Sequence, residues 1–212
     1  MTGQTASRFP IAVLLSGTGR TLENLIERIE QDSLPLDIQF VLSSHSNVRG
    51  LEVAKSAGLE AIELLPNEVG TAEEYSERIF SRCRSAGVQL VVLAGFIRLL
   101  YVPSDFEMRV VNIHPSLIPA FCGKGFYGSR VHKAVIESGV KQSGCTVHFV
   151  DNEYDHGPIL LQQSVPVLSD DTPQSLADRV FAAECKAYPI ALQAIAEGRI
   201  QVDGTRIRVE SR

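Results

Sequence analysis

Short apolar runs and longer amphipathic segments alternate along this chain, and the alternation limits the folds it can adopt. Short runs rich in Val, Ile and Leu are typical of buried strands, whereas apolar residues that recur at helical spacing are typical of helices. Strands are predicted at residues 11–15, 38–42, 61–65, 90–94, 110–113, 146–150 and 159–165, and helices at 22–29, 51–57, 71–86, 131–137 and 173–197. This order predicts a doubly wound α/β domain with a mostly parallel sheet.

The predicted helices have recognisable end signals. Thr71 followed by Glu74 has the spacing of a capping box, and Pro173 suits the first turn of the long C-terminal helix. Pro189 lies inside that helix, where its ring and missing N–H are expected to kink or divide it. Gly204 lies between two short β-like runs, which predicts a small hairpin after the helix.

Length and charge limit the classes of function. A chain of 212 residues buries roughly 70% of its unfolded surface, so we expect a single domain at residues 11–212 after a flexible tail at residues 1–10. The formal charge of −5 is spread along the chain without a basic block, and no nucleic-acid partner is expected. No apolar run approaches the roughly 20 residues that span a bilayer, and no signal peptide is evident. The four cysteines have no Cys-x-x-Cys spacing, which favours reduced thiols in a cytoplasmic protein.

A glycine-rich loop, Ser-Gly-Thr-Gly-Arg-Thr at residues 16–21, joins the first predicted strand to the first predicted helix. Free amides at the helix start suit a phosphate, although a tight turn alone also requires glycine. A Walker loop is excluded because Gly-Lys-Ser/Thr is missing, and Leu22 stands where a dinucleotide fingerprint needs a small residue. The loop therefore suits a single phosphate better than NAD. Arg20 is either a charged contact to that phosphate or a solvated surface charge.

The stretch Val-Asn-Ile-His-Pro-Ser at residues 111–116 is the most informative. Side chains two apart on a strand share a face, so Asn112 and His114 are predicted to point the same way. Pro115 cannot donate to a sheet ladder and is expected to end the strand. The pair is therefore predicted at the carboxyl end of a strand, the edge at which open α/β sheets bind ligands. The glycine loop follows a strand end at the same edge.

Two more polar residues follow on the next predicted strand and in the turn after it. Thr146 and His148 share a face, and Asp155 lies in the turn. His148 either supports the groups on the neighbouring strand or is a hydrogen-bonded core histidine. Asp155 either places a carboxylate over the strand edge or is an ordinary turn residue.

These residue types favour direct acyl transfer. No Gly-x-Ser-x-Gly elbow surrounds Ser116, and no spacing such as His-Glu-x-x-His supports a metal site, so we expect a metal-free reaction. The amide of Asn112 and an imidazolium at His114 can donate hydrogen bonds to the oxyanion of a tetrahedral intermediate. A carboxylate at Asp155 favours the charged imidazole and assists proton transfer.

Three motifs together resemble the folate-dependent formyltransferase family: Asn-Ile-His-Pro-Ser-Leu-Ile-Pro at residues 112–119, Thr-Val-His-Phe-Val at 146–150 and Asp-His-Gly-Pro-Ile-Leu at 155–160. The resemblance extends from residue 11 to about residue 200. The glycine loop, Leu-Ala-Gly-Phe at residues 93–96 and Glu184 with Tyr188-Pro189 resemble the branch that acts on glycinamide ribonucleotide. The resemblance implies a Rossmann-like fold and a role in purine biosynthesis. There the formyl group of the co-substrate 10-formyltetrahydrofolate passes to the amine of glycinamide ribonucleotide.

The resemblance also implies roles for individual residues. Asn112, His114 and Asp155 match catalytic residues, and His148 matches a residue that supports them. The residues matching the phosphate and ribose site are Ser16, Gly17, Thr18, Gly19, Arg20, Thr21 and Glu184. The residues matching the folate site are Arg98, Leu99, Leu100, Val150, Asn152 and Asp155. Residues 11–110 would then form the phosphate- and nucleotide-binding half, and residues 111–212 the catalytic and folate-binding half. Apart from the resemblance, Arg98 and Glu184 would be surface charges, and Leu99 and Leu100 core residues.

Two segments depart from the family pattern on the acceptor side: Arg20-Thr21 replaces Ser-Asn, and residues 121–128 replace a shorter loop. The alternative enzyme is formyltetrahydrofolate deformylase, in which water replaces the amine; a non-catalytic folate- or nucleotide-binding module is a further alternative. Because the first predicted strand begins at residue 11, we do not expect the N-terminal domain of deformylases. Nor do we expect the C-terminal RNA-binding domain of methionyl-tRNA formyltransferase. Small-molecule substrates are the expected partners, and the sequence is compatible with a homodimer.

Overall fold

A seven-stranded sheet forms the centre of the computed structural model, which describes residues 8–210. The strands lie in the order β3-β2-β1-β4-β5-β6-β7. They are β1 (Phe9–Leu15), β2 (Leu36–Ser43), β3 (Ala61–Glu63), β4 (Leu90–Leu93), β5 (Val110–His114), β6 (Gln142–Phe149) and β7 (Ile159–Pro166). β1 to β5 pair in parallel, and β6 and β7 continue the sheet in antiparallel pairing. The mostly parallel α/β fold expected from the sequence is confirmed.

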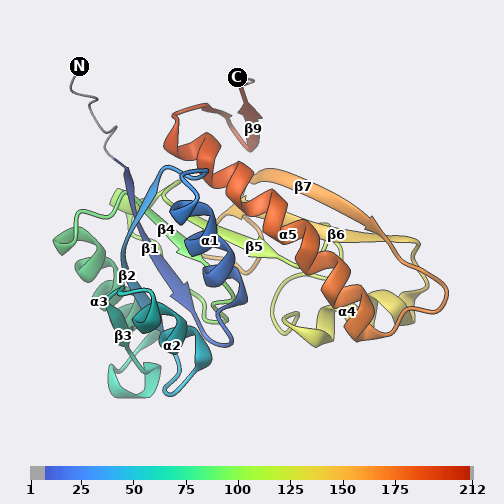
Figure 1. Cartoon of the computed structure of the whole chain (residues 1–212), viewed down its shortest axis with the longest axis horizontal. Helices are drawn as coiled ribbons and strands as arrows, with labels where there is room; N and C mark the ends of the chain where they lie inside the picture. Colours follow the sequence, from blue (N-terminus) through green and yellow to red (C-terminus); the bar gives the residue numbers. More distant parts are fainter. Residues whose placement is uncertain (1–7, 211–212) are drawn as a thin grey trace.

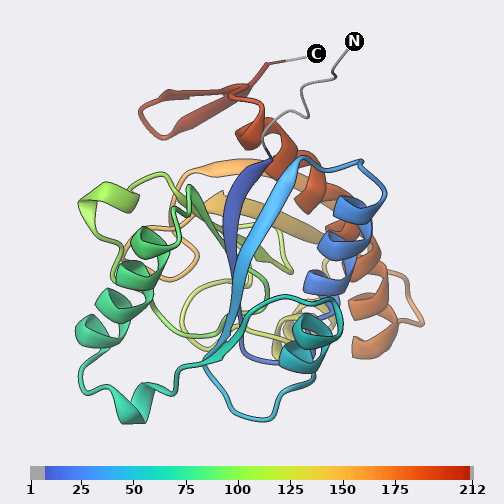
Figure 2. The ribbon, with the colours of Figure 1, turned by 60° about the vertical axis from the view of Figure 1, so that its left-hand side comes forward.

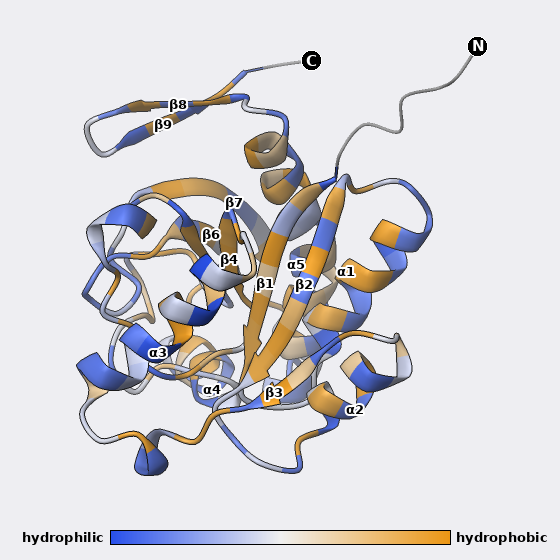
Figure 3. Ribbon diagram, turned by 90° about the vertical axis from the view of Figure 1, so that its left-hand side faces the viewer, coloured by the Kyte–Doolittle hydropathy of each residue, from blue (hydrophilic) through white to orange (hydrophobic). Residues whose placement is uncertain are grey.

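Helices cover both faces of this sheet (Figures 1 and 2). They are α1 (Arg20–Glu30), α2 (Arg49–Ser56), α3 (Ala72–Ser85), α4 (Ser129–Ser138) and α5 (Pro173–Ala196), with short 3-10 turns at Pro66–Glu68 and Ser104–Phe106. Residues of α1, α4 and α5 join one apolar cluster and residues of α3 the other. Strand β1 contributes to both, because Ile11 and Val13 face the first cluster and Ala12 and Leu14 the second. Burial on both faces explains why β1 is apolar along its length (Figure 3).

Of the predictions made for the helices, the structure confirms the capping box at Thr71 but shows no division at Pro189. The capping box is confirmed, since Thr71 Oγ1 accepts a hydrogen bond from the Glu74 amide and Glu74 accepts one from the Thr71 amide. Pro189 does not divide the long helix, and α5 is continuous through it. The neighbouring Tyr188 is buried, and its hydroxyl donates to the carbonyl oxygens of Leu93 and Val111 at 2.9 and 3.1 Å. This anchoring to the sheet outweighs the backbone hydrogen bond that proline removes.

The two ends of the chain complete the fold. β1 begins at Phe9, so Phe9 and Pro10 belong to the sheet and not to the expected tail. Residues 1–7 of that tail lie outside the described residues. After α5, β8 (Ile200–Asp203) and β9 (Arg206–Val209) form the expected antiparallel hairpin. Between residues 8 and 210, no helix is both long and apolar enough to cross a bilayer.

Candidate active site

The carboxyl ends of β1, β4 and β5 open onto one cleft of about 1030 Å³. The chain order reverses between β1 and β4, and ligands of open α/β sheets bind at such a switch point. Single small-molecule sites usually measure roughly 300–1,000 Å³, so this cleft has room for a large ligand or two smaller ones. Its walls include residues 17–21, 93–100, 112–115, 123–130 and parts of the turn after β6 and of α5.

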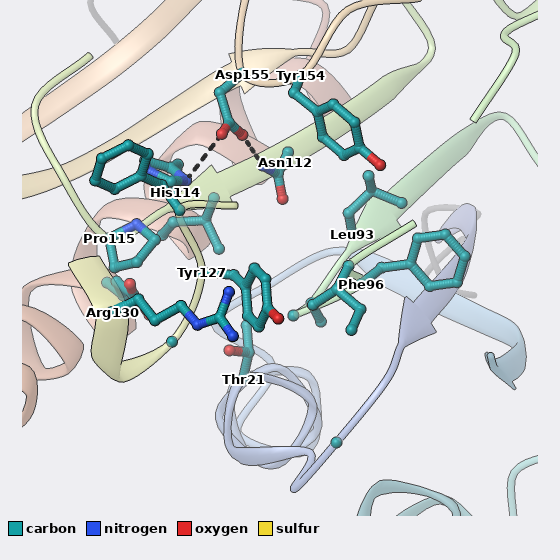
Figure 4. Close-up of a pocket in the computed structure, with 18 of the residues that line it drawn as sticks. Thr21, Leu93, Phe96, Asn112, His114, Pro115, Tyr127, Arg130, Tyr154 and Asp155 are labelled. Carbon is teal, nitrogen blue, oxygen red and sulfur yellow. Dashed lines mark hydrogen bonds and ion pairs between the residues drawn. The ribbon is translucent and has the colours of Figure 1, made fainter. Parts of the chain in front are cut away.

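The strand pairing brings the predicted catalytic residues together on one wall (Figure 4). In the antiparallel register of β5 and β6, Asn112 lies opposite His148 and His114 opposite Thr146. His114 Nδ1 is 3.4 Å from Asp155 Oδ2, and Asn112 Nδ2 is 3.4 Å from Asp155 Oδ1. The Asp155 side chain is only 11% exposed. The carboxylate therefore interacts with both donors largely shielded from water.

Hydrogen bonds fix the protons on the two histidines. His114 Nε2 lies 3.0 Å from the carbonyl oxygen of Phe121, which can only accept, so Nε2 bears a proton. Its Nδ1 faces Asp155 Oδ2 at 3.4 Å. His148 differs: its Nδ1 donates to the Phe149 carbonyl at 2.8 Å, and burial lowers its pKa. His148 is therefore neutral at neutral pH, and its Nε2 is free to accept.

Neutral His148 determines which way the Asn112 amide points. Its Nε2 accepts one N–H of Asn112 Nδ2 at 3.1 Å. The other N–H of Asn112 points at Asp155, at the longer distance of 3.4 Å. His114 Nδ1 also faces Asp155, at 3.4 Å. These two long contacts are the ones that a substrate oxygen can replace, while the shorter ones hold the side chains in place.

Asp155 is held in an unusual backbone conformation. Its φ is 53°, in the left-handed region that costs a non-glycine residue about 1–3 kcal/mol. The Gly123 amide donates to its Oδ2 at 2.9 Å and so ties the turn to the loop after β5. Gly157 permits the tight turn, because a Cβ there would lie 2.0 Å from the Phe149 carbonyl oxygen. Strain of this kind, maintained by surrounding contacts, is typical of functional sites.

The glycine loop faces the opposite side of the cleft. Helix α1 begins at Arg20 after Gly19, which has φ 77° and no side-chain cap. The backbone amides of Arg20 and Thr21 have no hydrogen-bond partner among residues 8–210 and are available to a ligand. A Cβ at Gly19 would lie 2.6 Å from Gly50 Cα, so the close approach of α1 and α2 also requires this glycine.

Three of the residues expected to bind substrate have other contacts. The Ser16 hydroxyl lies 2.6 Å from Ser44 Oγ and accepts the Ile97 amide at 3.2 Å; Ser16 is not among the residues that line the cleft. Asn152 is likewise absent from the lining, and its Oδ1 accepts the Val102 amide. Arg20 lines the cleft but stacks 3.8 Å above the Phe181 ring and pairs with Asp178 at 3.6 Å. Ser16 and Asn152 therefore brace the loops around the site.

The remaining expected residues line the cleft as their positions suggested. Gly17, Thr18, Gly19, Thr21 and Glu184 line the cleft, and so do Arg98, Leu99, Leu100 and Val150. Burial raises the pKa of Glu184 to about 8, although Arg20 opposes this shift. Glu184 is therefore protonated in a large fraction of molecules at neutral pH and can donate as well as accept a hydrogen bond.

In the sequence, residues 121–128 stood out only as a departure from the family pattern on the acceptor side, and the contribution of α4 to the cleft was not predicted. The loop after β5 and the first turn of α4 contribute Lys124, Phe126, Tyr127, Arg130 and His132. The only signal in the sequence is the dense run of glycines after the His-Pro motif, at which Gly123, Gly125 and Gly128 adopt positive φ. Among the described residues, no group of three or more His, Cys, Asp or Glu side chains is arranged to hold a metal ion.

Comparison with known proteins places these observations in a family. The formyl transferase family model matches residues 9–192. The chloroplastic phosphoribosylglycinamide formyltransferase of Arabidopsis thaliana is 39% identical over 92% of this chain and 68% of its own length. The trifunctional purine biosynthetic protein adenosine-3 of Gallus gallus is 39% identical over 92% of this chain, which spans only 19% of that longer protein.

A solved structure agrees with this assignment. Glycinamide ribonucleotide transformylase 1 from Symbiobacterium toebii superposes with a TM-score of 0.91 at 38% identity, and the match covers 97% of this chain and 96% of that one. The fold, the motifs around Asn112, His148 and Asp155 and the sequence matches agree with one another. The chain belongs to the formyl transferase family.

Proposed function

We propose that this chain transfers the formyl group of 10-formyltetrahydrofolate to the amine of glycinamide ribonucleotide, as a phosphoribosylglycinamide formyltransferase of purine biosynthesis. Relatives with that name are 39–40% identical over 92% of the chain. The observation that supports the chemistry best is the convergence of Asn112, His114 and Asp155 on the cleft that also contains the glycine loop.

In this proposal the acceptor amine attacks the formyl group directly, without a covalent enzyme intermediate. The amine nitrogen bonds to the formyl carbon, and the carbonyl oxygen becomes an oxyanion. His114 Nδ1–H and the second N–H of Asn112, which now make the long contacts to Asp155, donate to that oxyanion. Asp155 is then free to accept a proton from the attacking amine. The intermediate collapses by breaking the bond to the folate nitrogen, which receives the proton.

The two substrates occupy different sides of the cleft in this proposal. The ribonucleotide phosphate binds the uncapped start of α1 at Gly17–Thr21, and Glu184 contacts the ribose. The folate lies along Arg98, Leu99, Leu100 and Val150, next to Asp155. We assign residues 11–110 to the nucleotide-binding half and residues 111–212 to the catalytic and folate-binding half, although Glu184 of α5 lies on the acceptor side. Cytoplasmic location, a metal-free reaction, and assembly as a homodimer stay predictions.

The test compares consumption of 10-formyltetrahydrofolate by the pure enzyme with and without glycinamide ribonucleotide. Transfer predicts consumption only with the acceptor, and formylated ribonucleotide as the product. Arg20→Ala and Glu184→Ala should raise the acceptor KM while folate affinity is kept, and Arg28→Ala, in the last turn of α1, is the matched control. Equal consumption in both conditions with release of formate would replace the transferase with the deformylase.

A further inference from the structure

Arg130, in the first turn of α4, presents a charge that no carboxylate within residues 8–210 neutralises. Its guanidinium lies 4.8 Å from the centre of the Tyr127 ring, and it makes no ion pair or side-chain hydrogen bond within residues 8–210. Arg20 and Arg49, also near the glycine loop, instead pair with Asp178 and Glu23. An arginine that is stacked on a ring but has no anionic partner keeps its donors available for a ligand.

The position of Arg130 directs that charge into the acceptor side of the cleft. Arg130 and Thr21 both line the cleft, and Figure 4 shows Arg130 extending from α4 toward Thr21 in the first turn of α1, with the Tyr127 ring beside it. Two helix starts therefore face one space, and both follow a glycine without a side-chain cap. The backbone amides of Ser129 and Arg130 have no partner among the described residues.

His132 gives an independent indication that a ligand completes this wall. It is 5% exposed and lines the same cleft, and its buried Nδ1 has no hydrogen-bond partner among residues 8–210. Its Nε2 also makes no hydrogen bond within the described part of the chain. A polar side chain this deeply buried normally has a partner. Burial and the neighbouring His114 lower its pKa, so the ring is neutral and offers one donor.

From these contacts we infer that the first turn of α4 forms the second half of the acceptor's anion site, with Arg130 as its principal cation. The ligand is a phosphate monoester held between the start of α1 and the start of α4. A dianionic phosphate has enough oxygens for the amides of one helix start and for the guanidinium of the other. Arg20, held by Phe181 and Asp178, then contributes less than Arg130. The assignment of this phosphate to glycinamide ribonucleotide rests on the proposed function.

The experiment uses Arg130→Gln, the conservative Arg130→Lys, and Lys133→Gln as the matched control. Lys133 lies on the same helix and pairs with Glu137 at 3.7 Å. Loss of a charge-assisted hydrogen bond predicts that Arg130→Gln raises the KM for glycinamide ribonucleotide about 10- to 100-fold. The kcat and the Kd for folate should change little, and Arg130→Lys should recover part of the loss. Inhibition by inorganic phosphate should weaken by a similar factor.

Three outcomes would overturn this inference, and they are distinguishable from a failure of the proposed function. If Arg130→Gln behaves like Lys133→Gln in acceptor KM and in phosphate inhibition, the Arg130 site is wrong even though the transferase stands. If the wild type shows no acceptor-dependent transfer, binding of inorganic phosphate to the folded protein, followed by amide NMR shifts, still tests the site. Unchanged phosphate binding in Arg130→Gln would then overturn it. A loss of folate affinity instead would assign Arg130 to the carboxylates of folate and would also overturn it.

Discussion

Asp155→Asn removes the carboxylate charge while keeping the shape of the side chain. At an effective dielectric of about 20, a charge pair separated by the 3.4 Å between His114 and Asp155 interacts by about 5 kcal/mol. If all of that stabilised the imidazolium in the transition state, the loss would be between 10³- and 10⁴-fold in rate. Part of it also acts in the ground state, so we expect kcat to fall by about 10²- to 10⁴-fold. The acceptor KM should change little, because the role proposed for Asp155 is mainly in the transition state.

The assay is steady-state transfer with both substrates varied, together with the pH dependence of kcat. Asp151→Asn is the control, because this turn carboxylate pairs with the exposed His156 at 2.7 Å. Thermal melting should show that both variants fold. The side-chain oxygen of the introduced asparagine can still accept a hydrogen bond from the Gly123 amide, so a large loss of stability is not expected. A variant that retains near-normal kcat would make Asp155 an ordinary turn residue and would refute the proton-transfer role.

Three further predictions use other parts of the site. A chelator should leave the transfer rate unchanged, and loss of activity that a divalent ion restores would contradict the metal-free mechanism. Phosphate or sulfate should shift the amide NMR signals of Gly17–Thr21, since those at the start of α1 are uncapped; signals that stay in place at saturating phosphate would move the anion site elsewhere. Stability should also depend on pH through Glu184, whose pKa of about 8 in the folded protein lies above its ordinary value of 4.5. The folded state then binds more protons between these values, so this group's contribution to stability falls as pH rises from about 4.5 to 8. Glu184→Gln should flatten the decline in melting temperature over that range, and an unchanged slope would show that Glu184 is ionised in the folded protein.

The sequence by itself determined the elements and the side chains that share a face. Strand periodicity placed Asn112 and His114 on one face of β5, and Pro115 marked the end of that strand. The capping box at the start of α3 is equally local, because Thr71 and Glu74 are three residues apart. These features follow from chain geometry over a few residues, which any fold containing the segment would keep.

Only the tertiary structure decided which distant groups meet. Asp155 approaches His114 because of the way β6 packs beside β5. The packing of α5 gives Arg20 its neighbours Phe181 and Asp178. The packing of α4 brings Arg130 and His132 into the cleft. Pro189 is the converse case: its local preference predicts a kink or a division of the helix, but α5 is continuous and Tyr188 anchors it to β4 and β5. Contacts between residues far apart in the chain are set by burial and packing of whole elements, and no local pattern encodes their distances.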